Sequence, residues 1–314
     1  MISKQEFISE CDKIIAPEEM EEYNKKKRKR TILLAILLPI EVVIWLIIMA
    51  NTNIGYVSGI ILVLAMIITL IIVIVSTKFH WKDFKTKYGK QVIEIVLKDQ
   101  QFRYESRGGL PSYLLSASGF CGNFERCSGE DFFQLNIPKD DGTPSNVEFT
   151  ISDMYATRTE TYRVTSVDSK GRSTTRTETR TVVVYSGLLG YVKFPFKFKC
   201  NLSLNAAYPV GDKIKLEDIK FNKLFKVFTD NQIEALVMLT PTMMEKLKAL
   251  NNRLSGIKIM LRQNGEFFIG AGKDMFTLNK KKPTGAAFEY FYDDLADFLA
   301  IINEIKNNNK LFDM

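Results

Sequence analysis

Two long apolar segments dominate the hydrophobic pattern near the N-terminus of the chain. They cover Thr31–Ala50 and Ile54–Thr77, and only the short polar loop Asn51–Asn53 separates them. Each is as long as the roughly 20-residue helix that crosses a bilayer. A helix that packs on a soluble core would carry polar residues on each turn, whereas Thr69 is the only polar residue among residues 60–75. Because a backbone in lipid must satisfy its own hydrogen bonds, residues 31–77 predict a transmembrane helical hairpin.

Basic residues flank both ends of this hairpin and predict its orientation. The hexad Lys25–Arg30 precedes the first segment, and a group of lysines follows the second: Lys78, Lys82, Lys85, Lys87 and Lys90. Lys and Arg concentrate on the cytoplasmic side, so we expect a multi-pass protein of the cell membrane with both termini in the cytoplasm. The first segment begins only at Thr31 and lacks a small-residue cleavage motif, so it is not typical of a signal peptide.

Helical spacing continues on both sides of the hairpin. Before Pro17, apolar residues share one helical face: Phe7, Ile8, Cys11, Ile14 and Ile15. Residues 1–30 are therefore interpreted as a cytoplasmic amphipathic and basic segment. The pattern after the hairpin predicts a helix that continues through residues 78–107 into the cytosol, with a strand beginning near Gln100.

From residue 110 onward, short segments alternate with turn residues. Asp131–Ile137 and Asn146–Ile151 predict a β-hairpin around a turn-rich stretch. Residues 157–181 are rich in Thr, Arg and Glu, and their β-prone arms carry opposite charges for cross-strand pairing, which predicts a two-stranded ribbon. Further strands are expected at Val182–Tyr185 and at Tyr191–Cys200, where Phe residues alternate with Lys and Pro.

Cap and turn signals organise the last third of the chain. Asp230 is expected to cap a helix that starts at Asn231, and Thr240 with Pro241 to begin the next helix. Asn264-Gly265 predicts a hairpin with a type I′ turn. The chain ends in an amphipathic helix with an apolar face: Phe288, Phe291, Leu295, Phe298, Leu299, Ile302 and Ile305.

These elements predict the fold class. Strands come in runs joined by turns, which is typical of α+β proteins rather than of alternating βαβ units. We expect the N-terminal transmembrane hairpin to be followed by a cytoplasmic domain over residues 78–314, in which helices pack against one face of an antiparallel sheet. The ribbon at residues 157–181 belongs to this domain.

Composition and charge narrow the choice of partners. The chain has 314 residues and a net charge of +7, and the surplus lies in the two clusters beside the hairpin. Such clusters attract anionic lipid headgroups by about 1 kcal/mol per residue, so membrane lipids are predicted partners. No basic stripe with interleaved aromatic residues follows downstream, so we expect no nucleic acid.

The residues suited to catalysis or metal binding are few and badly spaced. The chain has four cysteines (Cys11, Cys121, Cys127 and Cys200) and one histidine, His80, which does not favour a zinc site. It lacks a phosphate loop, a dinucleotide fingerprint and a nucleophile elbow. We therefore predict no catalytic, cofactor-binding or metal-binding residue and no cofactor.

Carboxylates leave two hypotheses open. Glu130, Asp131 and Asp153 are the candidates for an enzyme that uses carboxylates alone, although an acidic pair after Ser-Gly is more typical of a turn or cap. Glu41 lies within the first membrane segment, where a carboxyl group is costly. It indicates either an ion or proton path, or a structural hydrogen bond across the hairpin or within a homo-oligomer. We favour the structural alternative because two helices do not enclose a path.

Four stretches carry a resemblance to a known family: Gly122–Phe132, Tyr185–Leu189, Lys215–Asp230 and Ile233–Pro241. In these stretches the chain resembles the bacterial family called domain of unknown function 3137, over about Tyr104–Phe276. The resemblance implies two membrane helices followed by a cytoplasmic domain, and no known activity. The Thr/Arg ribbon resembles the variable insert that this family has at the same place.

The predicted function is therefore a membrane-anchored cytoplasmic module that binds or scaffolds a protein partner, rather than an enzyme. A first alternative is an accessory subunit of a membrane transport or envelope complex. A second is the carboxylate-dependent enzyme, which we expect least.

Overall fold

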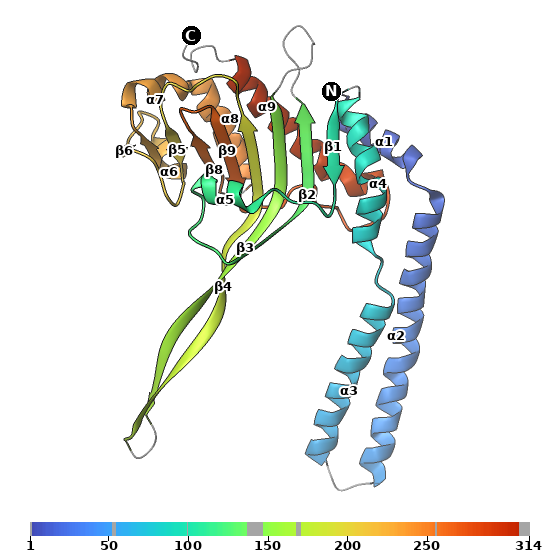
Figure 1. Cartoon of the computed structure of the whole chain (residues 1–314). Coiled ribbons are helices and arrows are strands. Elements are labelled where there is room, and N and C mark those ends of the chain that lie inside the picture. Colours follow the sequence, from blue (N-terminus) through green and yellow to red (C-terminus); the bar gives the residue numbers. More distant parts are fainter. Residues whose placement is uncertain are drawn as a thin grey trace. The chain divides into compact units, whose positions relative to one another are not determined.

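The chain divides into two compact units. The computed structural model describes residues 2–51, 55–98, 100–136, 147–167, 171–254 and 256–307. The helical unit comprises Ile2–Tyr88 and Leu278–Glu289. The sheet unit comprises Gly89–Thr277 and residues 290–307 (Figure 1).

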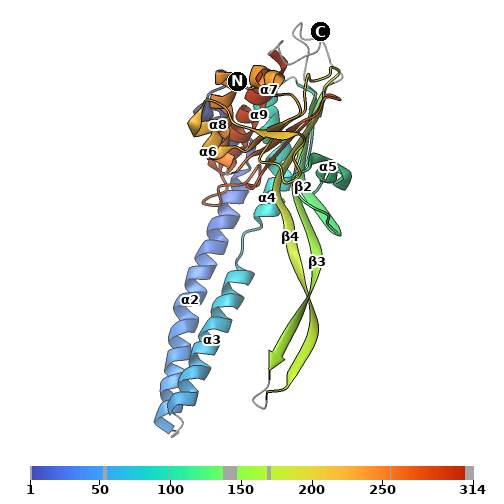
Figure 2. The same cartoon turned by 90° about the vertical axis from the view of Figure 1, so that its left-hand side faces the viewer.

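Two long helices run side by side in the helical unit, as both views show (Figure 1, Figure 2). They are α2 (Pro17–Asn51) and α3 (Gly55–Ser76). The ring of Pro17 suits the first position of α2, where no backbone N–H is needed. Among the described residues, these are the two helices long and apolar enough to cross a membrane. Most of their apolar side chains are exposed.

The N-terminal helix α1 (Lys4–Ile14) packs on η1 (Gly285–Phe288), a short 3₁₀ helix from the far end of the sequence. The Gly285 N–H donates a hydrogen bond of 2.6 Å to the Asp12 carboxylate. A Cβ atom at Gly285 would stand 2.2 Å from the Ile8 carbonyl oxygen, so a residue without a side chain is required at this contact. The first helix of the helical unit therefore packs against a segment that lies more than 270 residues later in the sequence.

The helix after the hairpin is shorter than the sequence pattern predicts. α3 ends at Ser76, and α4 (Trp81–Leu97) starts only after the turn at residues 77–80, so the predicted continuous helix is wrong here. The Thr77 hydroxyl donates a 2.6 Å hydrogen bond to the Val73 carbonyl. Phe79 turns inward and is buried. The turn thus exchanges helical hydrogen bonds for the burial of an aromatic ring.

Within its described residues, the sheet unit forms a nine-stranded sheet in the order β1-β2-β3-β4-β9-β8-β5-β7-β6, and each pair of neighbours is antiparallel. The strands are β1 (Phe102–Glu105), β2 (Arg126–Asn136), β3 (Glu148–Val167), β4 (Ser173–Lys193), β5 (Leu202–Leu204), β6 (Asp212–Ile214), β7 (Val227–Thr229), β8 (Lys258–Leu261) and β9 (Glu266–Ala271). Together with the apolar helix pair, this sheet confirms the predicted α+β class.

The two longest strands pair with each other through the whole of both predicted ribbon arms. Beside the sheet, β3 also pairs with β2 and β4 with β9, but beyond Thr157 the two strands continue alone as a ribbon (Figure 1). Glu160 accepts hydrogen bonds from Arg158 and Arg180, and the Tyr162 hydroxyl donates to Glu178. Of the strand segments expected separately at Asn146–Ile151 and Val182–Tyr185, residues 148–151 belong to β3 and residues 182–185 to β4. Asn146 and the turn before it lie outside the described residues.

Helices cover both faces of the sheet (Figure 2). The larger ones, α8 (Pro241–Leu254) and α9 (Glu289–Asn307), lie on one face, and α5 (Ser112–Ser118) lies on the other. Alternation along β3 explains this: Phe149 stacks on Phe298 of α9, whereas Met154 packs in the cluster that contains α5. The expectation of helices against one face is therefore too narrow.

Lys258 of β8 and Arg262, the residue after this strand, hold α5 in place. The Lys258 ammonium donates a 2.9 Å hydrogen bond to the Phe120 carbonyl, and Arg262 donates to the Ala117 carbonyl. These two carbonyls lie at the C-terminal end of α5, where the helix itself supplies no donors. The short helix is therefore held by the strand beneath it.

The remaining helices, α6 (Ile219–Leu224) and α7 (Gln232–Met238), show where cap prediction succeeded and failed. The cap of α7 is Asn231, which accepts the Glu234 N–H, so the assignment to Asp230 is wrong. Asp230 instead accepts the Asn201 N–H at 2.9 Å. Thr240 caps α8 by accepting the Met243 N–H at 3.2 Å.

Two further local predictions need correction. β4 ends at Lys193, and residues 194–200 are irregular, because Pro195 has no N–H for a strand ladder and the rings of Phe194 and Phe196 stack 4.8 Å apart. The hairpin of β8 and β9 is present, but its turn is not type I′. Only Gly265 has a positive φ, +88°, which fits a three-residue loop with glycine in the left-handed position.

The ribbon should be the least protected part of the long strands. A two-stranded ribbon is marginal in water, so in hydrogen-exchange mass spectrometry of the full chain residues 158–167 and 173–182 should exchange faster than Leu188–Lys193. The last segment belongs to the same strand as one ribbon arm and is the internal control. Equal protection of both parts would contradict the expectation and show that another surface covers the ribbon.

Candidate functional site

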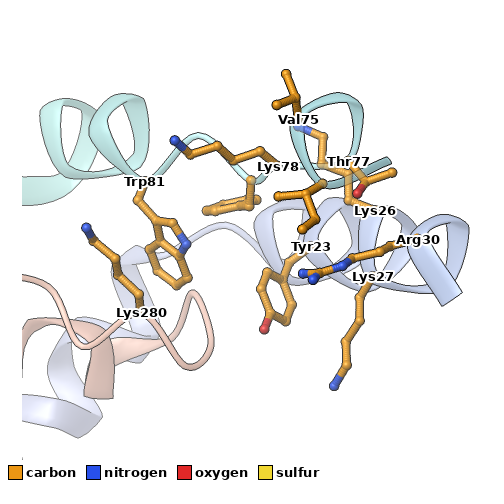
Figure 3. A pocket seen from close by; sticks show the side chains of 11 residues that line it. Tyr23, Lys26, Lys27, Arg30, Val75, Thr77, Lys78, Trp81 and Lys280 are labelled. Atoms are coloured by element: carbon orange, nitrogen blue, oxygen red, sulfur yellow. The ribbon is translucent and has the colours of Figure 1, made fainter. Parts of the chain in front are cut away.

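A pocket of about 480 Å³ lies in the helical unit, where the apolar stretch of α3 ends (Figure 3). Its lining comes from α2, from the end of α3 and the turn after it, and from the segment before η1. The lining residues are Tyr23, Lys26, Lys27, Arg30, Ile74, Val75, Thr77, Lys78, Phe79, Trp81 and Lys280.

Aromatic rings build one wall of this pocket. Phe79 lies edge-on to Tyr23 and to Trp81, with ring centroids 5.7 Å and 5.0 Å apart. The Tyr23 hydroxyl donates a 2.7 Å hydrogen bond to the Lys281 carbonyl, which ties the segment before η1 to α2. Edge-to-face contacts stabilise such a cluster beyond the burial of its surface. The wall is therefore held by packing and by a hydrogen bond.

Positive charge surrounds the aromatic wall. Lys26 is paired with Glu22 at 2.6 Å, and this hydrogen bond lowers the pKa of Glu22. The other four cations of the lining are Lys27, Arg30, Lys78 and Lys280, and none of them pairs with an acidic side chain in the part of the chain that the structure describes. The pocket therefore carries about four uncompensated positive charges.

These groups suit an anionic ligand with an apolar part. Arg and Lys donate charge-assisted hydrogen bonds to phosphate or carboxylate oxygens. Ile74 and Val75, at the end of the apolar stretch of α3, add exposed aliphatic surface at the same pocket. The lining can therefore contact both a negative charge and an apolar group.

Sequence reasoning found the basic clusters but not the pocket. The aromatic group Phe79 and Trp81, directly after an apolar segment, is the signal that was available, because amphipathic rings gather at membrane interfaces. Lys280 could not be assigned, since it reaches the pocket from a segment far along the chain.

The structure places Glu41 on the side of α2 that contacts α3. The Thr69 hydroxyl of α3 donates a hydrogen bond to Glu41 Oε1, which is the bond across the hairpin that the structural hypothesis required. Glu41 Oε2 and Trp45 Nε1 are both buried, and neither has a hydrogen-bond partner among the described residues. An acceptor on Glu41 and a donor on Trp45, one helical turn away, therefore remain unsatisfied among the described residues.

The three candidate carboxylates serve different ends. Glu130 is exposed, whereas Asp131 and Asp153 are buried. Asp131 accepts a 2.7 Å hydrogen bond from the Tyr104 hydroxyl. Burial of the Tyr104 hydroxyl, and to a smaller extent the negative charge of Asp131, raise the pKa of Tyr104. Asp153 accepts the Met275 N–H with both oxygens, at 2.9 and 3.1 Å. Asp131 and Asp153 are therefore engaged in hydrogen bonds within the protein.

Sequence reasoning overlooked a third buried carboxylate, Asp294 of α9. It is 2% exposed, accepts the Phe276 N–H at 2.9 Å and lies 3.8 Å from the Arg253 guanidinium. Burial raises the pKa of Asp294 from 3.8 to about 6, against the opposing effects of Phe276 and Arg253. The available signal was an acidic residue inside the apolar stripe of the last helix.

The cysteines are free thiols, and burial raises the pKa of each of them, that of Cys11 to about 12. The single histidine, His80, lies with its Nδ1 atom 3.5 Å from the Lys26 ammonium.

Comparison with known protein families gives a match. Residues 172–307 match the model of a family described as "Protein of unknown function (DUF3137)". The chain resembles the DUF3137 family. No curated protein and no solved structure matches the chain.

The match confirms the resemblance drawn from the sequence motifs and locates it. Three of the four motif stretches lie inside the matched residues, and Gly122–Phe132 lies before them. The DUF3137 match therefore covers one ribbon arm and the rest of the chain up to the end of α9. It includes Lys280, whereas the other lining residues of the pocket precede it.

Asp294 should make the stability of the sheet unit depend on pH. Its pKa is raised in the folded state, so its contribution is present below about pH 4 and is lost as the pH rises through 6. Asp294→Asn keeps an oxygen acceptor for Phe276 but cannot ionise. Between pH 4 and pH 7 the unfolding free energy of the native chain should fall by about 2 kcal/mol relative to Asp294→Asn. Denaturant titrations followed by circular dichroism in detergent would measure this difference, and a constant difference would contradict the prediction.

Glu41 should act through its hydrogen bond rather than through its charge. Glu41→Gln keeps an acceptor for Thr69, so its thermal unfolding in detergent should match that of the native protein. Thr69→Val removes the donor and should cost on the order of 0.6 kcal/mol, as side-chain hydrogen bonds between membrane helices do. Loss of an ion flux across vesicles in Glu41→Gln would overturn the structural hypothesis.

Proposed function

We propose that the protein is a membrane-anchored module whose hairpin α2–α3 crosses the membrane and whose sheet unit binds or scaffolds a protein partner in the cytoplasm. One observation supports the anchoring most strongly. Apolar side chains along both helices face outward: Ile36 is 52% exposed, Ile47 57%, Ile60 64% and Val75 68%. Monomeric soluble proteins rarely expose apolar patches beyond a few hundred Å².

A soluble core helix and a signal sequence both fit these two helices less well than a membrane anchor does. The core helix of a soluble protein would be buried, whereas only 0% and 17% of the most apolar stretches of the two helices are buried. A signal sequence would account for one apolar helix, and α3 would remain. The basic residues at both cytoplasm-facing ends support the proposed orientation.

We propose that the sheet unit binds a partner for two reasons. Its buried carboxylates are already hydrogen-bonded within the protein, and many polar side chains of its ribbon are exposed. Asp131 and Asp153 hold structural donors, which argues against the carboxylate-dependent enzyme. The ribbon presents Thr, Arg and Glu side chains on a long exposed arm. An extended polar arm of this kind supports contact with another protein.

One observation favours the accessory-subunit alternative. Glu41 Oε2 and Trp45 Nε1 are buried polar atoms without partners among the described residues, and both lie on α2. An unsatisfied polar group is costly in lipid, so a further membrane helix that reaches these atoms by opening the packing between α2 and α3 would be stabilised by bonding them. The two proposals agree on the anchor and differ in whether the partner lies in the membrane.

Labelling with a membrane-impermeant thiol reagent tests the anchor and its orientation. In intact cells Asn53→Cys should react, whereas Ser173→Cys in the ribbon should react only after the membrane is permeabilised. A chain in which the half-buried Cys127 is replaced by serine supplies the background. Labelling of Ser173→Cys in intact cells would overturn the orientation. Release of the protein from membranes by alkaline carbonate would overturn the anchor itself.

A further inference from the structure

We infer that the pocket of the helical unit is a site for a single anionic phospholipid whose phosphate headgroup carries more than one negative charge. The inference rests on the proposed membrane placement of α2 and α3. It goes beyond a diffuse attraction of basic flanks, because it assigns the ligand to specific residues and one pocket.

The charge of the pocket defines the headgroup. Lys27 and Arg30 come from α2, Lys78 from the turn after α3 and Lys280 from the segment before η1, so residues of three chain segments line one space. In Figure 3 the Lys27 ammonium points away from the other labelled groups. None of the four has an acidic partner among the described residues. A phosphodiester with one charge would leave most of this charge uncompensated. A phosphomonoester, or a headgroup with two phosphates, matches it better, and Arg30 can bind such oxygens with two parallel hydrogen bonds.

The apolar lining favours a lipid over a soluble phosphate. Ile74 and Val75 stand at the end of the apolar stretch of α3 and are exposed. They offer contact to a glycerol backbone and to the first carbons of an acyl chain, which a free phosphate lacks. Tyr23 and Trp81 carry amphipathic rings of the kind that settles at headgroup depth. The volume of about 480 Å³ lies in the range of sites for small ligands.

The basic hexad supplies its own control. Arg30 lines the pocket, whereas Arg28 and Lys29 belong to the same run and do not. All three are exposed residues of α2. A surface attraction would respond equally to the loss of any two charges, since each basic residue near the membrane contributes a similar amount. A pocket would respond only to the loss of its lining.

Trp81 reports directly on occupancy. The chain has two tryptophans, Trp45 and Trp81, so Trp45→Phe leaves the pocket residue as the only one. This variant of the full chain is placed in phosphatidylcholine nanodiscs that contain a small fraction of anionic lipid with brominated acyl chains. Bromine quenches tryptophan fluorescence at short range. Phosphatidic acid should quench Trp81 at lower lipid fractions than phosphatidylglycerol, which carries one charge.

Paired variants in this background decide between pocket and surface. Arg30→Gln with Lys78→Gln should weaken the quenching by phosphatidic acid roughly ten-fold, whereas Arg28→Gln with Lys29→Gln should change it less than about two-fold. Equal losses in both pairs would overturn the pocket. Equal quenching by the two lipids would overturn the preference for a multiply charged headgroup.

Soluble competitors separate the lipid from a free anion. Glycerol phosphate and inorganic phosphate should not relieve the quenching, because they lack the acyl contact with Ile74 and Val75. Relief by either at concentrations comparable to the lipid would reassign the pocket to a soluble phosphate and overturn the lipid. Carbonate extraction of the same variants keeps the two proposals apart. A protein that stays in the membrane but shows no selective quenching loses the lipid site alone.

Discussion

Water exclusion from the outward faces of α2 and α3 is the constraint on which the helical unit depends. Each large aliphatic side chain contributes about 1.5–3 kcal/mol when it leaves water completely, and both helices present such residues along their length. In the proposed membrane this requirement is met by lipid rather than by the rest of the chain. The hairpin then needs only close packing and the bond from Thr69 to Glu41 to hold its two helices together.

The pocket follows from the unequal lengths of these two helices. α2 continues without a break from Pro17 to Asn51, whereas α3 stops at Ser76. The chain after Ser76 must turn, and it turns around the buried ring of Phe79. Beside the uninterrupted basic turns of α2, this leaves a space with an aromatic wall and a cationic rim. The end of the apolar helix α3 therefore forms one side of the pocket.

Local signals in the sequence predicted the elements, and tertiary contacts decided the rest. The apolar runs, the cap at Thr240 and the hairpin at Gly265 all act within a few residues, so they could be found without a structure. The alternating phenylalanines after Lys193 have strand periodicity, but their rings pack on one another in an irregular segment. Asp230 has a side chain suited to a helix cap, but it accepts a hydrogen bond from the Asn201 N–H instead. The pocket needed Lys280, whose proximity to α2 no local pattern encodes.

Two buried carboxylates, Asp153 and Asp294, bind the backbone at the end of the sheet unit. The backbone leaves the sheet unit after Thr277, and the two preceding N–H groups, of Met275 and Phe276, are bound by Asp153 and Asp294. A charged acceptor in the interior is costly unless donors face it. Here the donors belong to a segment that has no strand or helix of its own to satisfy them. The interior acids therefore hold the backbone in place at the end of the sheet unit.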